Sequence, residues 1–400
     1  MPVRLLTPTF VALAIATLVF YIASGVALTA TPLFGERHLG LTKALIGVAT
    51  AAFSVAAIAM RPVVGWATDR YGRRRVLLIG ATGTVLALLF HLVAVNLPLF
   101  IVARCLLGAG EAFWLVAALA AAADLAPEGR RGESLSFLSL TLYVGLAVGP
   151  GIAETILAAG GSFALVWLVT AGIAAISLGL AWVVPETAPP APATGLPGEA
   201  NPSRGGRPRL IHPAGLFPGF VILLGLSGMA YYLSFLPLYV RTIGLDAATI
   251  PLAEYGAIVV LLRIVGARLP DQIGPVRLSG SALAASALGL GLIAVVQNLT
   301  GLLVGTALFA FGVAFIMPAL LSLAVSRVPP EERGSVVGTA TLFIDVSFGI
   351  APVALGVVAQ AGGYPLGFLV AGVVSLFGCV LLVGGGSPGP FWRRAATLGG

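Results

Sequence analysis

The stretch GWATDRYGRRR occupies residues 65–75 and separates two long apolar runs. It places one Asp, four Arg, two Gly and a Tyr in a chain whose residues are only 9% charged. Short, strongly basic connections between apolar segments lie on the cytoplasmic side of membrane proteins. The stretch therefore predicts a cytoplasmic turn between two membrane-spanning helices.

The composition excludes a soluble protein. The chain has 400 residues, of which 58% are hydrophobic, and its mean hydropathy is +1.05. With so few charged residues it cannot build a water-facing shell, and a crossing helix needs about 20 apolar residues. We therefore predict an all-α polytopic membrane protein with twelve membrane-spanning helices. The apolar runs lie near residues 9–31, 44–64, 76–95, 98–122, 134–157, 162–184, 215–239, 248–269, 278–297, 300–326, 335–359 and 363–384.

The basic residues indicate the orientation of the chain. If the N-terminus is inside, all of them lie at or near the inner side except Arg37, Lys43, Arg241 and Arg104. This bias predicts that both termini are cytoplasmic. The net charge of +7 is spread over these connections, so it does not predict a nucleic-acid partner. Lys43 is the only lysine, which suggests a GC-rich bacterial genome and hence a multi-pass protein of the bacterial cytoplasmic (inner) membrane.

The longest polar segment, residues 185–212, divides the chain into two groups of six spans. It is rich in Pro, Gly and Ala and cannot bury a core, so it is interpreted as a flexible cytoplasmic linker. The predicted organisation is a first six-helix bundle over 1–184, the linker, a second six-helix bundle over 213–390, and a cytoplasmic tail over 391–400.

The two halves repeat each other at one constant offset in the numbering. An even number of spans per half makes them parallel repeats, with a binding site expected at their interface near the middle of the membrane. The offset aligns Arg61 with Arg263, Asp69 with Asp271, Gly72 with Gly274, Arg131–Gly132 with Arg333–Gly334, and Pro150 with Pro352.

Several motifs resemble those of the major facilitator superfamily. Residues 65–75 match its loop pattern Gly-x-x-x-Asp-Arg-x-Gly-Arg-Arg at every defined position, and residues 266–277 are a degraded copy. Residues 104–112, RCLLGAGEA, match the fourth-helix pattern Arg-x-x-x-Gly-x-x-x-Ala. Residues 145–151, GLAVGPG, resemble the fifth-helix pattern of proton-coupled exporters. Gly145, Gly149 and Pro150 match that pattern, whereas Ser136, Ala153 and Glu154 depart from it.

The loop motif is interpreted as a gate. Asp69 can accept hydrogen bonds from free N–H groups at the start of a neighbouring helix, which the resemblance identifies as the one beginning near Ser335. Arg73 and Arg70 can reach acidic groups such as Asp124, and the alternative reading is that the Arg cluster only orients the chain. Gly65 allows close helix approach and Gly72 a left-handed turn. The predicted gating residues are Gly65, Asp69, Arg70, Gly72, Arg73, Arg74, Asp271 and Gly274.

Four charged residues within the predicted spans are candidates for proton coupling, because an ionisable group there costs roughly 2.5–3.5 kcal/mol. Arg104 and Glu111 lie on one face of a helix, roughly 10 Å apart, which is too far for a direct ion pair. Glu154 lies within reach of Arg104, and the pair could couple two fluxes or simply join two helices. Asp345 lies near the middle of its span as a lone buried carboxylate, either a proton site or a group satisfied by neighbours such as Thr341.

Six aromatic residues are candidates for stacking on a substrate in an apolar cavity, although aromatic side chains in spans more often serve packing. They are Tyr21, Trp114, Tyr143, Tyr231, Tyr232 and Phe235. Cys105 and Cys379 show no disulfide or metal spacing, and no metal or organic cofactor is predicted.

The sequence thus predicts a secondary transporter rather than an enzyme. It would work by alternating access, as a monomer in the lipid bilayer, with protons and a small molecule as its partners. The favoured function is proton-coupled efflux of a hydrophobic or amphiphilic small molecule, driven by the proton gradient. The alternative is a proton symporter that imports a sugar or an organic anion. A membrane sensor that transports nothing would leave the buried charges without a use.

Overall fold

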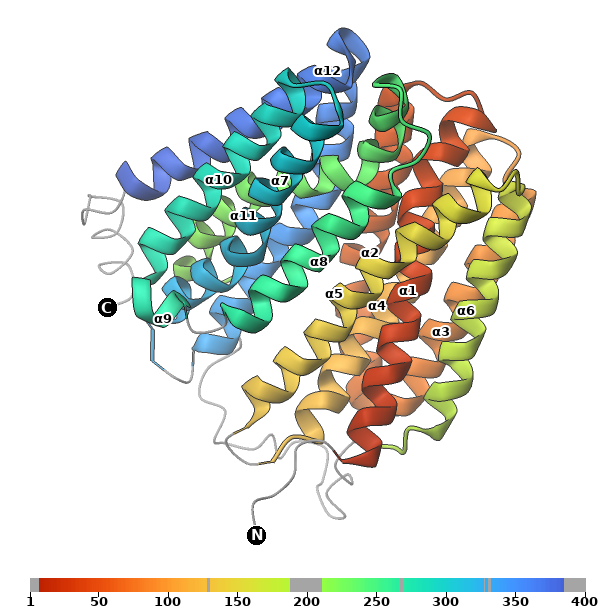
Figure 1. Cartoon of the computed structure of the whole chain (residues 1–400). Helices are drawn as coiled ribbons and strands as arrows, with labels where there is room; N and C mark the ends of the chain where they lie inside the picture. The colour runs from red at the N-terminus through yellow and green to blue at the C-terminus, as the bar shows by residue number, and fades with distance from the viewer. Residues whose placement is uncertain are drawn as a thin grey trace, which may run out of the picture.

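The computed structural model describes residues 7–127, 130–187, 211–266, 269–326, 328–329 and 332–384, and within them it is all-helical (Figure 1). This confirms the predicted all-α fold class. The helices of the first half are α1 Pro8–Arg37, α2 Lys43–Tyr71, α3 Arg73–Phe90 with the short 3₁₀ helix η1 His91–Val93, α4 Leu97–Asp124, α5 Arg131–Ala158 and α6 Phe163–Val183. Those of the second half are α7 Pro213–Thr242, α8 Thr249–Val265, α9 Leu269–Ile273, α10 Pro275–Val295, α11 Leu299–Val325 and α12 Arg333–Gly384.

Two helices that follow short turns begin at an asparagine N-cap. Asn96 accepts a hydrogen bond from the Leu99 N–H at the start of α4, and Asn298 accepts one from the Gly301 N–H at the start of α11. Each cap satisfies an N–H group that has no partner within its helix. The offset that aligns Arg61 with Arg263 also aligns these two Asn residues, so the repeat extends to the way the helices begin.

Ten described helices are long and apolar enough to cross a membrane, which supports a multi-pass membrane protein. Two features separate this count from the predicted twelve. Helix α8 has only 17 residues, and α12 runs over 52 residues with non-helical backbone at Gly362 and Gly363. The break begins between the predicted spans 335–359 and 363–384, at Gly362, and includes the first residue of the second span, Gly363. Twelve spans and cytoplasmic termini stay predictions, and so do the domain limits, since residues 188–210 and 385–400 lie outside the described part.

The first six helices pack on one another, and the helices of the second half form a second group (Figure 1). The halves meet where α2 packs against α12, α5 against α8, and α1 against α7. The repeat offset aligns α2 with α8, and it aligns α5 with the first part of α12. The α2–α12 and α5–α8 interfaces are therefore equivalent under the repeat.

The ends of the bundle are distinguished by their connections. The linker end carries residues 71–73, 124–127, 183–187 and 328–329. The far end carries residues 37–43, 158–163, 242–249 and 361–364.

Glycines of the fifth-helix motif set the packing of α5 within the first half. A Cβ atom at Gly145 would lie 2.7 Å from the Cβ of Tyr21, and one at Gly149 would collide with the Ile22 carbonyl oxygen. Such distances are too short for non-bonded carbon, so α1 and α5 reach this separation only without side chains there. Pro150 follows within the same helix and is buried.

Candidate functional site

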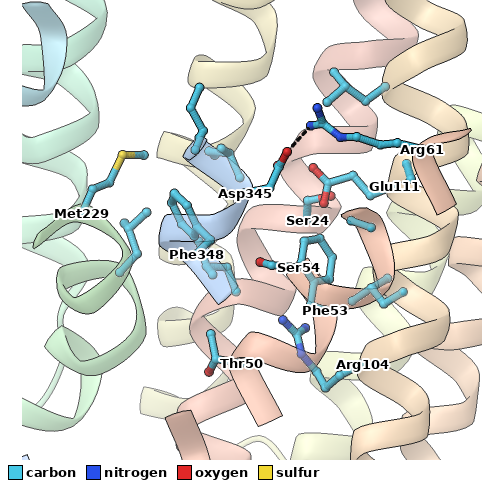
Figure 2. Close-up of a pocket in the computed structure, with 18 of the residues that line it drawn as sticks. Ser24, Thr50, Phe53, Ser54, Arg61, Arg104, Glu111, Met229, Asp345 and Phe348 are labelled. Atoms are coloured by element: carbon cyan, nitrogen blue, oxygen red, sulfur yellow. Dashed lines mark ion pairs between the residues drawn. The ribbon is translucent and has the colours of Figure 1, made fainter. Parts of the chain in front are cut away.

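A cavity of about 200 Å³ lies between the two halves (Figure 2). Its walls come chiefly from α1, α2 and α4 on one side and from α7 and α12 on the other. The residues that line it are Ser24, Leu28, Thr50, Phe53, Ser54, Ala57, Arg61, Arg104, Leu107, Glu111, Ala112, Leu115, Val116, Leu146, Met229, Leu233, Ile344, Asp345 and Phe348. Most are apolar, and the four ionisable ones comprise two bases and two acids.

Asp345 and Arg61 form an ion pair across the cavity wall (Figure 2). The Arg61 Nη2 and Asp345 Oδ2 atoms are 2.7 Å apart, and the side chains are 35% and 19% exposed. The pair joins α2 of the first half to α12 of the second. The prediction that Asp345 is a lone carboxylate is therefore wrong, because Arg61 points into the cavity instead of toward the linker end of α2.

Arg104 is almost fully enclosed, with 2% of its surface exposed. Its Nε donates to the Ala49 carbonyl oxygen at 3.4 Å, and its guanidinium lies 4.9 Å from the centre of the Phe53 ring. Among the described residues, no carboxylate forms an ion pair with it. The predicted pair between Arg104 and Glu154 is therefore not formed.

Glu154 instead pairs with Arg241 at the far end. The Arg241 Nη2 and Glu154 Oε2 atoms are 2.8 Å apart, and the Glu154 side chain is fully buried. Arg241 Nη1 also donates to the Pro237 carbonyl oxygen. The pair joins α5 to α7 and hence one half to the other. The sequence analysis did not predict this pair, because it placed Arg241 in a loop. In the structure the Arg241 side chain contacts Glu154 on α5.

Glu111 lines the cavity seven residues beyond Arg104 on α4, as predicted for two groups on one face. Its described neighbours include no positively charged partner within ion-pair distance. The hydroxyl of Tyr21 on α1 lies near the Glu111 carboxylate and is buried without a hydrogen-bond partner among the described residues. Of the six aromatic candidates, Tyr21 thus lies directly behind the cavity wall.

The other aromatic candidates do not line this cavity. Trp114 stacks on Phe20 at 4.5 Å inside the first half, and Phe235 is fully buried. The hydroxyls of Tyr231 and Tyr232 donate to the Tyr364 and Pro251 carbonyl oxygens, which fixes both rings within the second half.

Tyr143 lies at the α5–α8 interface, where the Arg263 guanidinium sits 3.9 Å from its ring centre. The aromatic rings that do line the cavity are Phe53 and Phe348, which sequence reasoning missed. Their spacing was the available signal, because Phe53 and Arg61 lie two turns apart on one face of α2, and Phe348 lies one turn beyond Asp345.

The loop motif holds the linker end of the first half together. Gly72 has φ of +90°, a conformation that suits glycine, and it separates α2 from α3. The N–H groups of Arg73 and Arg74 donate to the Glu186 carboxylate, which caps α3 from just beyond α6. Arg73 also pairs with Asp124 at 2.8 Å. Glu186 was not predicted, although a carboxylate is the expected partner of a free helix N-terminus.

The remaining motif residues take different roles. Asp69 is 82% exposed, and its described contact is with Arg73 at 3.7 Å rather than with the helix start near Ser335. Arg70 lies over the Trp66 ring, and Arg74 donates to the Trp182 carbonyl oxygen. A Cβ atom placed on Gly65 would have no neighbour within 4 Å, so the predicted close approach of helices is absent there.

The degraded copy of the motif repeats the turn of the first. Gly274 has φ of +88°, matching Gly72, and it precedes α10 as Gly72 precedes α3. The side chain of Asp271 lies outside the described part of the structure.

Contacts between the halves concentrate toward the far end. There the Lys43 Nζ donates to the Ala359 carbonyl oxygen at 3.3 Å, and the Tyr364 hydroxyl donates to Glu36 at 2.9 Å. The described ion pairs at the linker end, such as Arg73 with Asp124, each stay within one half. The cavity is thus closed over by inter-half contacts on its far side.

Known proteins resemble the chain over nearly its whole length. The profile of the Major Facilitator Superfamily matches residues 13–343 and 255–396. An uncharacterised MFS-type transporter of Salmonella typhimurium is 27% identical over 374 residues, which cover 90% of this chain and 92% of that protein.

Solved structures share the fold at lower identity. The inward-facing, unoccupied structure of a bacterial homologue of the human lysosomal transporter Spinster has a TM-score of 0.77 at 15% identity, covering 97% of this chain and 96% of that one. A D-xylose–proton symporter has a TM-score of 0.74 at 16% identity, with coverage of 93% and 96%. The profile match, joined to the loop motif and the two-half fold, shows that this chain is a membrane transporter protein of the major facilitator superfamily.

Proposed function

We propose that the protein is a proton-coupled secondary transporter that exports a hydrophobic or amphiphilic small molecule by alternating access. The observation that carries the proposal is the Arg61–Asp345 ion pair. It joins the two halves, and it does so within the wall of the cavity. A proton and a substrate can therefore act on the same inter-half contact.

Protonation of Asp345 would remove the negative charge that holds Arg61. The pair is partly exposed, with Arg61 35% and Asp345 19% accessible, and its loss removes a contact between the halves and so changes the balance between conformations. The halves could then rock about the cavity, with residues 1–184 moving against 213–390. The far end would open only after Glu154 and Arg241 separate.

The direction of access fits the loading step of an export cycle, and it fits the release step of an import cycle equally. In this structure the halves are joined toward the far end, and with cytoplasmic termini that end faces outward. The cavity would then take up substrate from the cytoplasm or the inner leaflet. The Spinster homologue to which the fold is similar was captured in an inward-facing state.

Import by proton symport is the second candidate, because Arg104 has no described carboxylate partner. A free guanidinium can bind an organic anion. The similarity to a D-xylose–proton symporter concerns the fold and leaves sugar import as part of this alternative.

The test uses purified protein in proteoliposomes that contain a pH-sensitive dye. A proton gradient is imposed, acidic inside, and lipophilic cations, sugars and organic acids are added outside. Release of protons on adding a lipophilic compound supports export by antiport. Proton entry driven by a sugar or an acid supports the symporter instead. A gradient that never responds to any compound, while the compounds still cross, would overturn proton coupling.

A further inference from the structure

The cavity has two charged ends that the transport cycle described above leaves unused. At one end Glu111 lies close to Asp345 and Arg61, which already neutralise each other at 2.7 Å. That end therefore carries one carboxyl group, Glu111, that has no ion-pair partner among the described residues. At the other end the Arg104 guanidinium likewise has no ion-pair partner among them. Figure 2 shows Arg104 and Glu111 at opposite sides of Phe53 and Ser54.

Neither charge is satisfied by the described protein. An arginine side chain offers five N–H donors, yet Arg104 uses one, toward the Ala49 carbonyl oxygen. Glu111 has the Tyr21 hydroxyl as its neighbour but no cationic partner in the described residues. Buried charges are normally paired, because leaving one unpaired in an apolar setting is costly. Both groups face the cavity, so a bound molecule could supply both counter-charges.

The surface between these ends is apolar or weakly polar. Phe53 and Leu107 contribute to it from α2 and α4. The opposite wall presents Met229, Leu233 and Phe348 from the second half. Along α4, Arg104 and Glu111 are separated by two helical turns, or roughly 10 Å. A ligand that meets both charges thus needs an apolar spacer of comparable length.

We propose that the substrate is a dipolar amphiphile, with a cationic amine held by Glu111 and an anionic group held by Arg104. This inference rests on the proposed function in that it takes the cavity as the transport site. It differs from the organic-anion alternative, which uses Arg104 alone. It also differs from a lipophilic cation, which uses Glu111 alone. The apolar spacer would lie against Phe53 and Phe348.

Binding to purified protein in detergent tests the inference separately from transport. The probes are ω-aminooctanoate, octylamine and octanoate, which share one chain length and differ only in their end groups. We expect ω-aminooctanoate to bind about tenfold tighter than either single-charge probe, as one added charge-assisted hydrogen bond provides. Equal affinity for all three, or no binding of ω-aminooctanoate, would overturn the inference.

Substitutions assign the two ends. Arg104→Gln should remove the advantage of ω-aminooctanoate over octylamine, and Arg104→Lys should restore part of it. Glu111→Gln should remove the advantage over octanoate. Thr50→Val is the matched control, because Thr50 lines the same cavity without a charge and spends its hydroxyl on the Ile46 carbonyl oxygen. Loss of the preference in Thr50→Val as well would contradict a charge-specific site.

Transport then separates this inference from the proposed function. Tight binding of ω-aminooctanoate with no proton-linked flux would leave the dipolar site in place and reject proton-coupled export. Proton-linked flux of a compound with no charged groups, in a protein that does not bind ω-aminooctanoate, would reject the dipolar site and leave proton coupling in place.

Discussion

The two interfaces related by the repeat carry the same arginine but different partners. At the α2–α12 interface Arg61 meets the Asp345 carboxylate at 2.7 Å. At the α5–α8 interface its repeat partner Arg263 lies 3.9 Å from the ring centre of Tyr143, which occupies the position equivalent to Asp345. A carboxylate loses its charge on binding a proton, whereas the face of an aromatic ring keeps its attraction for a cation. Only one of the two interfaces therefore carries a carboxylate at this level.

The far end reverses this asymmetry. There the ion pair lies on the α5 side, between Glu154 and Arg241. The positions equivalent to them under the repeat are Gly356 and Leu39, which carry no charge. Two ion pairs thus join the halves within the described residues, one at the cavity and one at the far end. The two pairs lie at different levels of the bundle. In an alternating-access cycle, one pair can therefore break while the other stays intact.

Asp345→Asn should have the largest effect, because it removes the carboxylate that distinguishes the two interfaces. We expect proton-driven accumulation in proteoliposomes to fall by about 10- to 100-fold, the loss of one charge-assisted contact. Exchange of substrate without a gradient should persist. Tyr143→Phe is the matched control and should keep transport, since the ring over Arg263 remains. Full proton-driven flux in Asp345→Asn would show that the carboxylate partner of Arg61 is not needed for proton coupling.

Glu154→Gln should shift the protein toward a state open at the far end, because Arg241 loses its buried counter-ion. With Cys105 and Cys379 replaced by Ser, a cysteine introduced at Ala359 reports on that end. We expect its reaction with a membrane-impermeant maleimide to rise roughly tenfold. Glu36→Gln is the control, because the amide can still accept the hydrogen bond from Tyr364. Unchanged labelling in Glu154→Gln would show that other contacts close the far end.

Tyr143→Asp would make the two interfaces alike by giving Arg263 a carboxylate partner. Transport at neutral pH should slow by about 2- to 10-fold, because a second ion pair must break. Acidification should restore the rate by discharging the new carboxylate. Tyr143→Asn removes the ring without adding the charge, and its rate should lack this added pH dependence. The same pH profile in both variants would contradict an ion pair at α5–α8.

Asp69→Asn should have the smallest effect on the folded protein. Its side chain is 82% exposed, and Arg73 keeps Asp124 as its nearer partner. We expect the free energy of unfolding to change by no more than about 0.5 kcal/mol. Asp124→Asn should lower the thermal unfolding midpoint more, because it removes the shorter of the two contacts to Arg73. Lost transport with unchanged stability would mean that Asp69 acts at the linker end of α2 in the other conformation.

The sequence predicts the helical fold, the loop turn and the repeat, because these depend on local apolar length and on turn residues. Gly72 and Gly274 adopt the same left-handed backbone, as their alignment under the repeat implies. The break at Gly362 and Gly363 also falls where the apolar runs separate. Such features are decided within a few residues of each other along the chain.

The pairing of buried charges could not be predicted in the same way. Arg61 and Asp345 lie far apart along the chain, so their contact depends on how two complete bundles dock. The prediction for Glu154 chose Arg104 because it lies on a neighbouring helix, but the docked second half brings Arg241 closer. The aromatic candidates failed for a related reason. The size and apolar character of an aromatic side chain predict that it is buried. Which side of its helix faces the cavity depends on how the helices pack together.

Glu186 lies at the beginning of the segment that connects the two halves, and its carboxylate binds the turn between α2 and α3. Because it caps α3 through the N–H groups of Arg73 and Arg74, the chain is anchored to the first half at least as far as this residue. A fusion partner, an epitope tag or a protease site should therefore be inserted beyond residue 187. An insertion directly after α6 would pull Glu186 from α3 and loosen the turn on which the first bundle depends.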